Sequence, residues 1–126
     1  MPVVLSQTDI RQLQLAKGAI SAGVQILAQR CGLPVGDVTR LHLAGAFGNY
    51  INVRSARRIG LLPVEERRII SAGNTALHGA KLALFSRDTA ALCAPILKLT
   101  QHLSLSADPQ FQDIYVQEMG FPDRLN

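Results

Sequence analysis

The chain has 126 residues, 48% of them hydrophobic, which is enough for one domain with a core. Its net charge of +4 permits nucleic-acid binding, but the arginine clusters have no interleaved stacking aromatics, so no nucleic-acid partner is expected. No apolar run approaches the roughly 20 residues of a membrane span, and no signal-like segment follows Met1, so we expect no membrane contact and a cytoplasmic location.

Two cysteines, Cys31 and Cys93, stand far apart in the sequence. Iron–sulfur and structural zinc sites take about four ligands. The sequence therefore predicts no metal site, and two buried free thiols are expected, with a disulfide as the alternative.

The amino-terminal part predicts one long helix after an edge strand over Met1–Leu5. Ser6 is a candidate N-cap with Asp9 three residues later, and Cys31-Gly32 ends the helix after Arg30. Apolar residues at three- and four-residue steps predict the buried stripe of this helix. These residues are Ile10, Leu13, Ile20, Val24 and Leu27.

Three polar residues of this helix, Gln14, Lys17 and Ser21, share one face because they are spaced at i, i+3 and i+7. Lys17 lies close to the apolar stripe. One interpretation is that its ammonium snorkels to water. The other is that the three side chains line a cleft and offer donors and acceptors to a ligand.

The segment from Val38 to Tyr50 predicts a short strand followed by a turn of small residues. Gly45 and Gly48 leave the backbone bare of bulk, so the turn can adopt positive φ and admit a planar or anionic group. Ligands of open α/β sheets bind at the carboxyl ends of strands. The alternative is a tight turn that only packs a helix onto the strand.

The rest of the chain alternates helices and strands, which predicts an α/β fold with a small, mostly parallel sheet flanked by helices. Pro95 is expected to kink or split the helix that contains it. The expected elements are a helix over Asn52–Ile59, a strand over Arg68–Ala72, a helix over Thr75–Phe85, a helix from Asp88 to about Lys98, a strand over Gln101–Ser106 and a last helix opening at Asp108-Pro109.

Five segments spread over nearly the whole chain resemble the carboxyl-terminal part of the ATP-dependent reductive activators of corrinoid proteins. They are Asp9–Lys17, Leu43–Tyr50, Ile59–Pro63, Gly73–Ala80 and Asp108–Asp113. The resemblance implies one subdomain of the actin-like, sugar-kinase and DnaK-type ATPase fold, which is ribonuclease H-like. Residues 1–126 would then form a single domain, the nucleotide-binding carboxyl-terminal subdomain of a larger activator.

The resemblance also implies a function and a set of site residues. Activators of this family return a Co(II) corrinoid protein to Co(I), and they carry an amino-terminal iron–sulfur (2Fe-2S) domain that this chain lacks. Adenosine contacts are implied for the helix face and for the glycine turn, where Ala46 replaces the more usual second glycine. These cofactor-binding residues are Gln14, Lys17, Ser21, Gly45, Ala46, Phe47, Gly48 and Asn49.

A pivot between two lobes is implied for the small residues Ala76, Gly79 and Ala80. ATP and Mg²⁺ are expected for the complete protein, but the phosphate loop and a catalytic carboxylate are missing here, so rapid ATP hydrolysis by this chain is not expected and no catalytic residue is assigned. The alternative is a non-enzymatic module that forms a homodimer or docks on a corrinoid protein through its small-residue and carboxyl-terminal helices.

Overall fold

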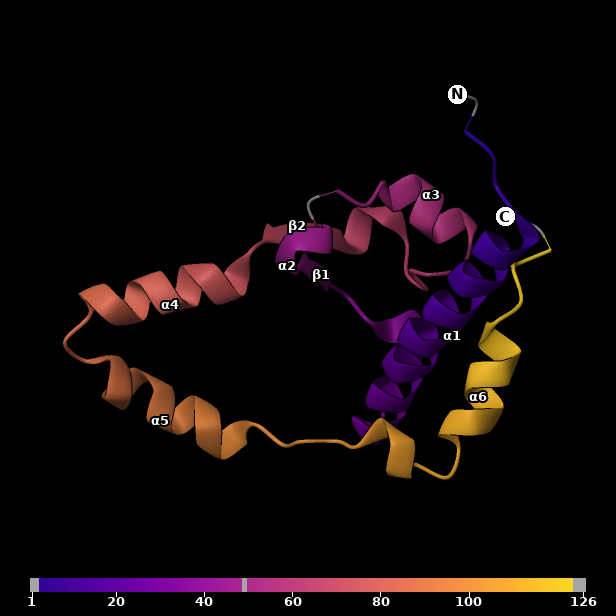
Figure 1. Cartoon of the computed structure of the whole chain (residues 1–126). Coiled ribbons are helices and arrows are strands. Elements are labelled where there is room, and N and C mark those ends of the chain that lie inside the picture. The colour runs from indigo at the N-terminus through magenta and orange to yellow at the C-terminus, as the bar shows by residue number, and fades with distance from the viewer. Residues whose placement is uncertain (1–2, 49, 124–126) are drawn as a thin grey trace.

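The computed structural model describes residues 3–48 and 50–123, which form helices around one pair of strands (Figure 1). The helices are α1 (Gln7–Arg30), α2 (Gly45–Gly48), α3 (Val53–Arg58), α4 (Thr75–Phe85), α5 (Thr89–Leu99) and α6 (Phe111–Glu118). The strands are β1 (Leu41–Ala44) and β2 (Ile69–Gly73), and short 3-10 turns lie at Val35–Asp37, Glu66–Arg68 and Leu105–Ala107. No helix within the described residues is both long enough and apolar enough to span a membrane.

Both ends of α1 are set by local signals, as predicted. The backbone N–H of Asp9 donates to Ser6 Oγ, and the Ser6 backbone N–H donates to the Asp9 carboxylate, so a complete capping box opens the helix. Cys31 is the C-cap, and Gly32 follows with a φ of 69°. Only glycine adopts such a φ without strain, so the chain turns away at this point.

The buried face of α1 is not the predicted apolar stripe. Leu13, Ile20 and Leu27 are 43%, 52% and 52% exposed. The helix instead buries its small and polar side, which consists of Lys17, Gly18, Ser21, Ala22, Gly23, Ile26 and Ala28. The physical reason is close helix packing, because small residues let a second helix approach the backbone.

That second helix is α6, which lies alongside α1 (Figure 1). A Cβ atom added at Gly18 would lie 3.0 Å from Met119 Cγ and 3.2 Å from the Tyr115 carbonyl oxygen. A larger residue at Gly18 would therefore push the helices apart. The stripe prediction failed because hydrophobicity alone does not show which side of α1 the second helix approaches, although the small residues at Gly18 and Gly23 indicated that another element could come close.

The sheet is small and parallel, as predicted. Leu41 pairs with Ile69, and Ala44 at the end of β1 pairs with Gly73 at the end of β2, after a register shift between Leu43 and Ala44. Both strands therefore end at the same edge of the sheet. The turns after them, which lead into α2 and α4, begin side by side.

Two of the predicted strands are absent from the described residues. Residues 3–5 have no strand partner, and the segment Gln101–Ser106 is irregular and leads into a 3-10 turn. Alternation predicted a strand there, but a strand needs a neighbour to hydrogen-bond. Leu105 packs on α1 instead, with its Cδ1 3.2 Å from the position of a Cβ added at Gly23. Helix α5 continues through Pro95, so the predicted split does not occur.

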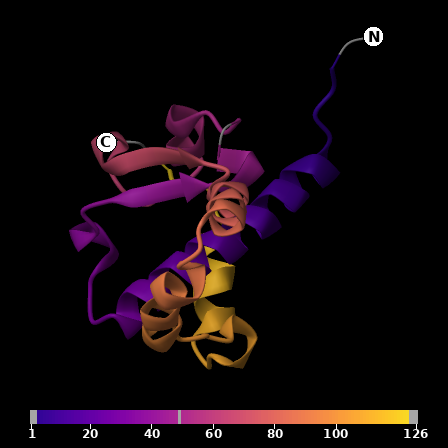
Figure 2. The same ribbon diagram turned by 90° about the vertical axis from the view of Figure 1, so that its left-hand side faces the viewer.

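Helices α4 and α5 form a hairpin that extends away from the α1–α6 pair (Figures 1 and 2). No residue of either helix is buried. Large apolar side chains are left open, with Phe85 89% exposed and Leu99 85% exposed. Neither helix packs on the small core, which contains Ala22, Ile26, Ala28, Ala56, Leu62 and Val64.

Candidate functional site

The carboxyl edge of the strand pair carries two glycines with positive φ. Gly45 follows β1 with a φ of 84°, and Gly73 ends β2 with a φ of 66°. Because Ala44 pairs with Gly73, these two turns are neighbours. Parallel α/β sheets bind ligands at this edge, where the backbone is accessible and helices begin.

The two glycines of the predicted turn have different surroundings. A Cβ atom added at Gly45 would meet nothing within 4 Å, so the backbone there is open to an approaching group. A Cβ atom added at Gly48 would lie 2.9 Å from both the carbonyl carbon and the carbonyl oxygen of Leu43. Gly48 is thus required for packing of α2 on β1, while Gly45 leaves room for a ligand.

The other predicted residues of this turn are described only in part. Ala46 and Phe47 are residues of α2, of which only the backbone is described. Asn49 lies outside the described residues. The contacts predicted for these three side chains therefore stay predictions.

Sequence reasoning did not include the β2 end in the site. Asn74 caps α4 there, and its Oδ1 accepts a hydrogen bond from the Leu77 backbone N–H at 3.1 Å. Gly73 and Asn74 belong to the Gly73–Ala80 segment of the resemblance, but no ligand contact was predicted for them. The parallel order of the two strands was the signal that could have placed them beside Gly45.

Lys17 is buried, with 3% of its surface exposed. Its Nζ donates to the carbonyl oxygens of Glu118 at 2.5 Å and Gly120 at 2.6 Å, and lies 3.7 Å from the Glu118 carboxylate. The snorkelling interpretation is therefore wrong, because the ammonium is bonded to protein rather than to water. Lys17 fastens α1 to the carboxyl-terminal end of α6.

Ser21 and Gln14 complete the predicted polar face. Ser21 Oγ donates to the Gly60 carbonyl oxygen at 3.0 Å, which fastens the turn after α3 to α1. Gln14 is half-buried. The nucleotide contacts predicted for Gln14, Lys17 and Ser21 stay predictions, and in this structure two of the three side chains join separate segments of the chain.

Further polar contacts hold α6 against α1. Gln25 Nε2 donates to the Glu118 carboxylate at 2.5 Å. Near the other end of the pair, Arg30 Nη2 donates to Asp108 Oδ2 at 2.6 Å. This bond to Arg30, followed by the Gln110 backbone N–H, lowers the pKa of the Asp108 carboxyl below its ordinary value.

A cavity of about 380 Å³ lies between α1 and α3. Its lining is almost entirely apolar, and the stem of Lys17 contributes to it. A cavity of this size is in the range that binds small planar groups. The residues that line it are Leu13, Ala16, Lys17, Ile20, Ile51, Asn52, Ser55, Ala56, Ile59 and Leu61.

The predicted pivot residues Ala76, Gly79 and Ala80 lie on α4 and are exposed. A Cβ atom added at Gly79 would meet nothing within 4 Å. Gly79 borders a cavity of about 280 Å³ between α4 and α5. Their role as a pivot stays a prediction.

The residues of this chain do not fit an iron–sulfur cluster. Cys31 and Cys93 are both free, as predicted, but they are exposed rather than buried. Two thiols cannot supply the four ligands of a 2Fe-2S centre. Over residues 3–48 and 50–123, no three His, Cys, Asp or Glu side chains gather as a metal site would require.

A parallel strand pair with a positive-φ glycine at the carboxyl end of each strand defines the chain as an α/β module, a class of fold that commonly binds ligands at this edge. The family described as the C-terminal domain of RACo, the ASKHA domain, matches residues 1–126. The chain belongs to this family.

Similar proteins agree with this assignment. The corrinoid activation enzyme RamQ of Eubacterium limosum is 40% identical over 124 residues, which are 98% of this chain and 21% of that protein. A Co(II) methylated amine-specific corrinoid protein reductase of Methanosarcina barkeri is 26% identical over 94% of this chain and 22% of its own length.

A solved structure agrees as well. A reductive activator for corrinoid, iron–sulfur protein has a TM-score of 0.82 at 36% identity, covering 94% of this chain and 19% of that one. The chain thus spans about one fifth of the length of these relatives.

Proposed function

We propose that this chain is the adenosine-side part of an ATP-dependent reductive activator that returns a Co(II) corrinoid protein to Co(I) in the cytoplasm. Membership of the ASKHA family supports nucleotide binding. The names of the relatives concern corrinoid activation and corrinoid protein reduction, which supports a corrinoid protein as the partner. One observation carries the site, namely the pairing of Ala44 with Gly73 next to the open Gly45.

In this proposal the nucleoside lies over the carboxyl edge of β1 and β2. The bare backbone at Gly45 lets a planar base or ribose approach more closely than any side chain would allow. The remainder of α2 borders this position, and Asn49 and Gln14 are further contacts expected from the sequence. Lys17 and Ser21, which are buried and bonded to backbone carbonyl oxygens, would have to exchange those bonds to reach a nucleotide. In the complete protein, hydrolysis of ATP with Mg²⁺ would supply the free energy for the uphill electron transfer.

The residues of this chain bind and orient the nucleotide, and they do not cleave it. Phosphoryl transfer depends on a phosphate cradle and on positioned metal ions, and the sequence contains neither an Asp-x-Gly-Thr element nor a carboxylate assigned to the attacking water. We therefore expect weak binding of ATP and ADP by the chain and negligible hydrolysis.

Calorimetric titration with ADP tests this proposal with a matched pair of variants. Gly45→Ala and Gly32→Ala both place a Cβ atom at a positive φ with nothing within 4 Å, so both carry similar backbone strain. Only Gly45 lies at the proposed site. A loss of ADP affinity in Gly45→Ala but not in Gly32→Ala supports the proposal. Equal affinity in both variants and the wild type contradicts it.

A second candidate function is that of an interaction module, because the α4–α5 hairpin leaves large apolar side chains such as Leu84 and Phe85 exposed. Such a surface suits a homodimer or docking on a corrinoid protein. Light scattering of the chain, alone and with a corrinoid protein, separates these outcomes. A monomer that does not respond to the corrinoid protein would leave the nucleotide-binding function as the better candidate.

A further inference from the structure

The net excess of positive charge in this chain lies in one segment. Residues 40–68 contain six arginines, two glutamates and no lysine or aspartate, so they carry the entire formal net charge of +4. The rest of the chain is balanced, with seven cationic and seven anionic side chains. A charge excess concentrated in this way sets up a local field that favours an anionic partner.

Helix α3 presents its arginines on one side. At about 100° per residue, Arg54, Arg57 and Arg58 lie together, opposite the side that lines the cavity against α1. Arg54 and Arg58 are exposed, and no ion pair to either of them forms within the described residues. Their guanidinium groups are therefore available on the outer surface of the helix.

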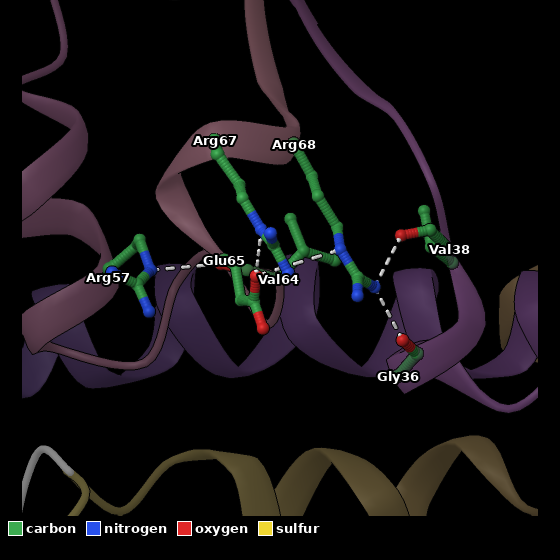
Figure 3. A network of polar contacts seen from close by, with 7 residues as sticks. All are labelled: Gly36, Val38, Arg57, Val64, Glu65, Arg67 and Arg68. Carbon is green, nitrogen blue, oxygen red and sulfur yellow. Dashed lines mark hydrogen bonds and ion pairs between the residues drawn. The ribbon is translucent and has the colours of Figure 1, made fainter.

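The next segment places two more arginines, Arg67 and Arg68, in a row with Arg57 (Figure 3). Arg67 Nε donates to the Glu65 carboxylate at 2.5 Å, and Arg68 Nε lies 3.9 Å from the same carboxylate. The hydrogen bond to Arg67 lowers the pKa of Glu65, and the charges of Arg67, Arg68 and Arg57 lower it further. One carboxylate thus lies among three guanidinium groups and cannot neutralise them.

Two of these arginines are held in place by backbone carbonyls. Arg57 Nε donates to the Val64 oxygen at 2.9 Å, and Arg68 Nη1 donates to the oxygens of Gly36 and Val38 at 2.7 and 3.1 Å (Figure 3). Side chains fixed before binding lose less conformational entropy when a partner arrives. We call the five residues Arg54, Arg57, Arg58, Arg67 and Arg68 the arginine face.

We propose that the arginine face is a docking surface for an acidic protein surface. Guanidinium forks match carboxylates in a bidentate geometry, and every cation of the segment is an arginine rather than a lysine. Tyr50, three residues before α3 begins at Val53, is 88% exposed, and tyrosine and arginine are both enriched in protein interfaces. Proteins that bind single-stranded nucleic acid use several aromatic side chains along a groove to stack with the bases, and this face lacks such a row of aromatic residues.

Binding of poly-L-glutamate, measured by fluorescence anisotropy at low salt, tests this proposal independently of nucleotide binding. The double variant Arg54→Glu/Arg58→Glu changes the arginine face. Its matched control, Lys81→Glu/Arg87→Glu, changes the net charge equally on exposed residues of α4 and the α4–α5 turn. We expect at least a roughly tenfold loss of affinity in the first variant and less than about threefold in the second.

Three results would overturn the proposal. An equal loss in both double variants would mean that only net charge matters. Undiminished binding by Arg54→Glu/Arg58→Glu would mean that the surface is not used. The third result concerns phosphate ligands, compared with poly-L-glutamate at matched charge. If inorganic polyphosphate or a DNA oligonucleotide bound more tightly than poly-L-glutamate, and Arg54→Glu/Arg58→Glu abolished that binding, the surface would be assigned to phosphate instead.

Discussion

Replacing Lys17 by methionine tests how this chain is held together. The methionine side chain is one atom shorter and keeps most of the packing against the cavity between α1 and α3, but it removes the donor that serves two carbonyl oxygens. A hydrogen bond from a charged group contributes about 1.5–3 kcal/mol, and a buried acceptor left unpaired costs about 1–3 kcal/mol. Removing a buried ammonium from the interior offsets part of this loss.

We therefore expect Lys17→Met to lower the free energy of unfolding by about 2–3 kcal/mol, equivalent to a fall in Tm of roughly 10 °C for a chain of this length. Glu118→Gln keeps both backbone carbonyls, removes the charge 3.7 Å from Nζ and leaves an amide oxygen that can still accept from Gln25, so it should cost less than about 1 kcal/mol. Lys81→Met on exposed α4 should change stability by at most about 0.5 kcal/mol.

Urea unfolding followed by circular dichroism measures all three variants. If Lys17→Met unfolds at the same urea concentration as Lys81→Met, the lysine does not fasten α6 to α1. If Glu118→Gln costs as much as Lys17→Met, the carboxylate rather than the carbonyl pair is the important partner. Either result would refute the reasoning given for Lys17.

Three further predictions concern local features of the fold. Gly48→Ala should destabilise the chain by about 1–3 kcal/mol in urea unfolding, because its Cβ would overlap the backbone of β1, whereas Gly36→Ala meets nothing within 4 Å and should change little. Ser6→Ala removes half of the capping box and should cost about 1 kcal/mol, seen as a lower Tm. In an NMR titration the Asp108 carboxyl should have a pKa below its ordinary value of 3.8, and the Arg30→Gln variant should raise this pKa toward 3.8. Because the pKa is lower in the folded state than in the unfolded state, the contact stabilises the chain above pH 3.8. That stabilisation is lost as the pH falls through the pKa of the folded state.

Local signals were sufficient to predict most elements. The caps Ser6 and Asn52 and the glycine at position 32 fix where helices begin or end, and α4 occupies the predicted range Thr75–Phe85. The parallel pairing of β1 with β2 also agrees with the α/β prediction. Each of these features depends on residues close in sequence or on a regular alternation of element types.

Features that depend on distant partners could not be predicted in this way. The carbonyl oxygens that bind Lys17 lie more than 100 positions further along the chain, so no local pattern indicates them. The alternation around Leu103 predicted a strand, yet no strand partner is present there in residues 3–48 or 50–123 and the segment packs on α1 instead. Hydrophobicity likewise does not tell which side of α1 meets α6.

The candidate site could be predicted in part. The small residues after β1 indicated a turn with positive φ, and Gly45 adopts it. The sequence did not distinguish the open Gly45 from the tightly packed Gly48, because only the fold of α2 back onto Leu43 separates them. It indicated Gly73 only through the predicted parallel order of the strands, and the register that pairs Ala44 with Gly73 comes from the fold.

The most direct test of the proposed site is the two-dimensional amide NMR spectrum of the folded chain during titration with ADP and Mg²⁺. We expect saturable shifts of the Gly45 and Gly73 amide signals, with smaller changes elsewhere. An ADP titration that leaves both signals in place, or that shifts only the amides of Arg54 and Arg58, would contradict nucleotide binding at the carboxyl edge of the strands.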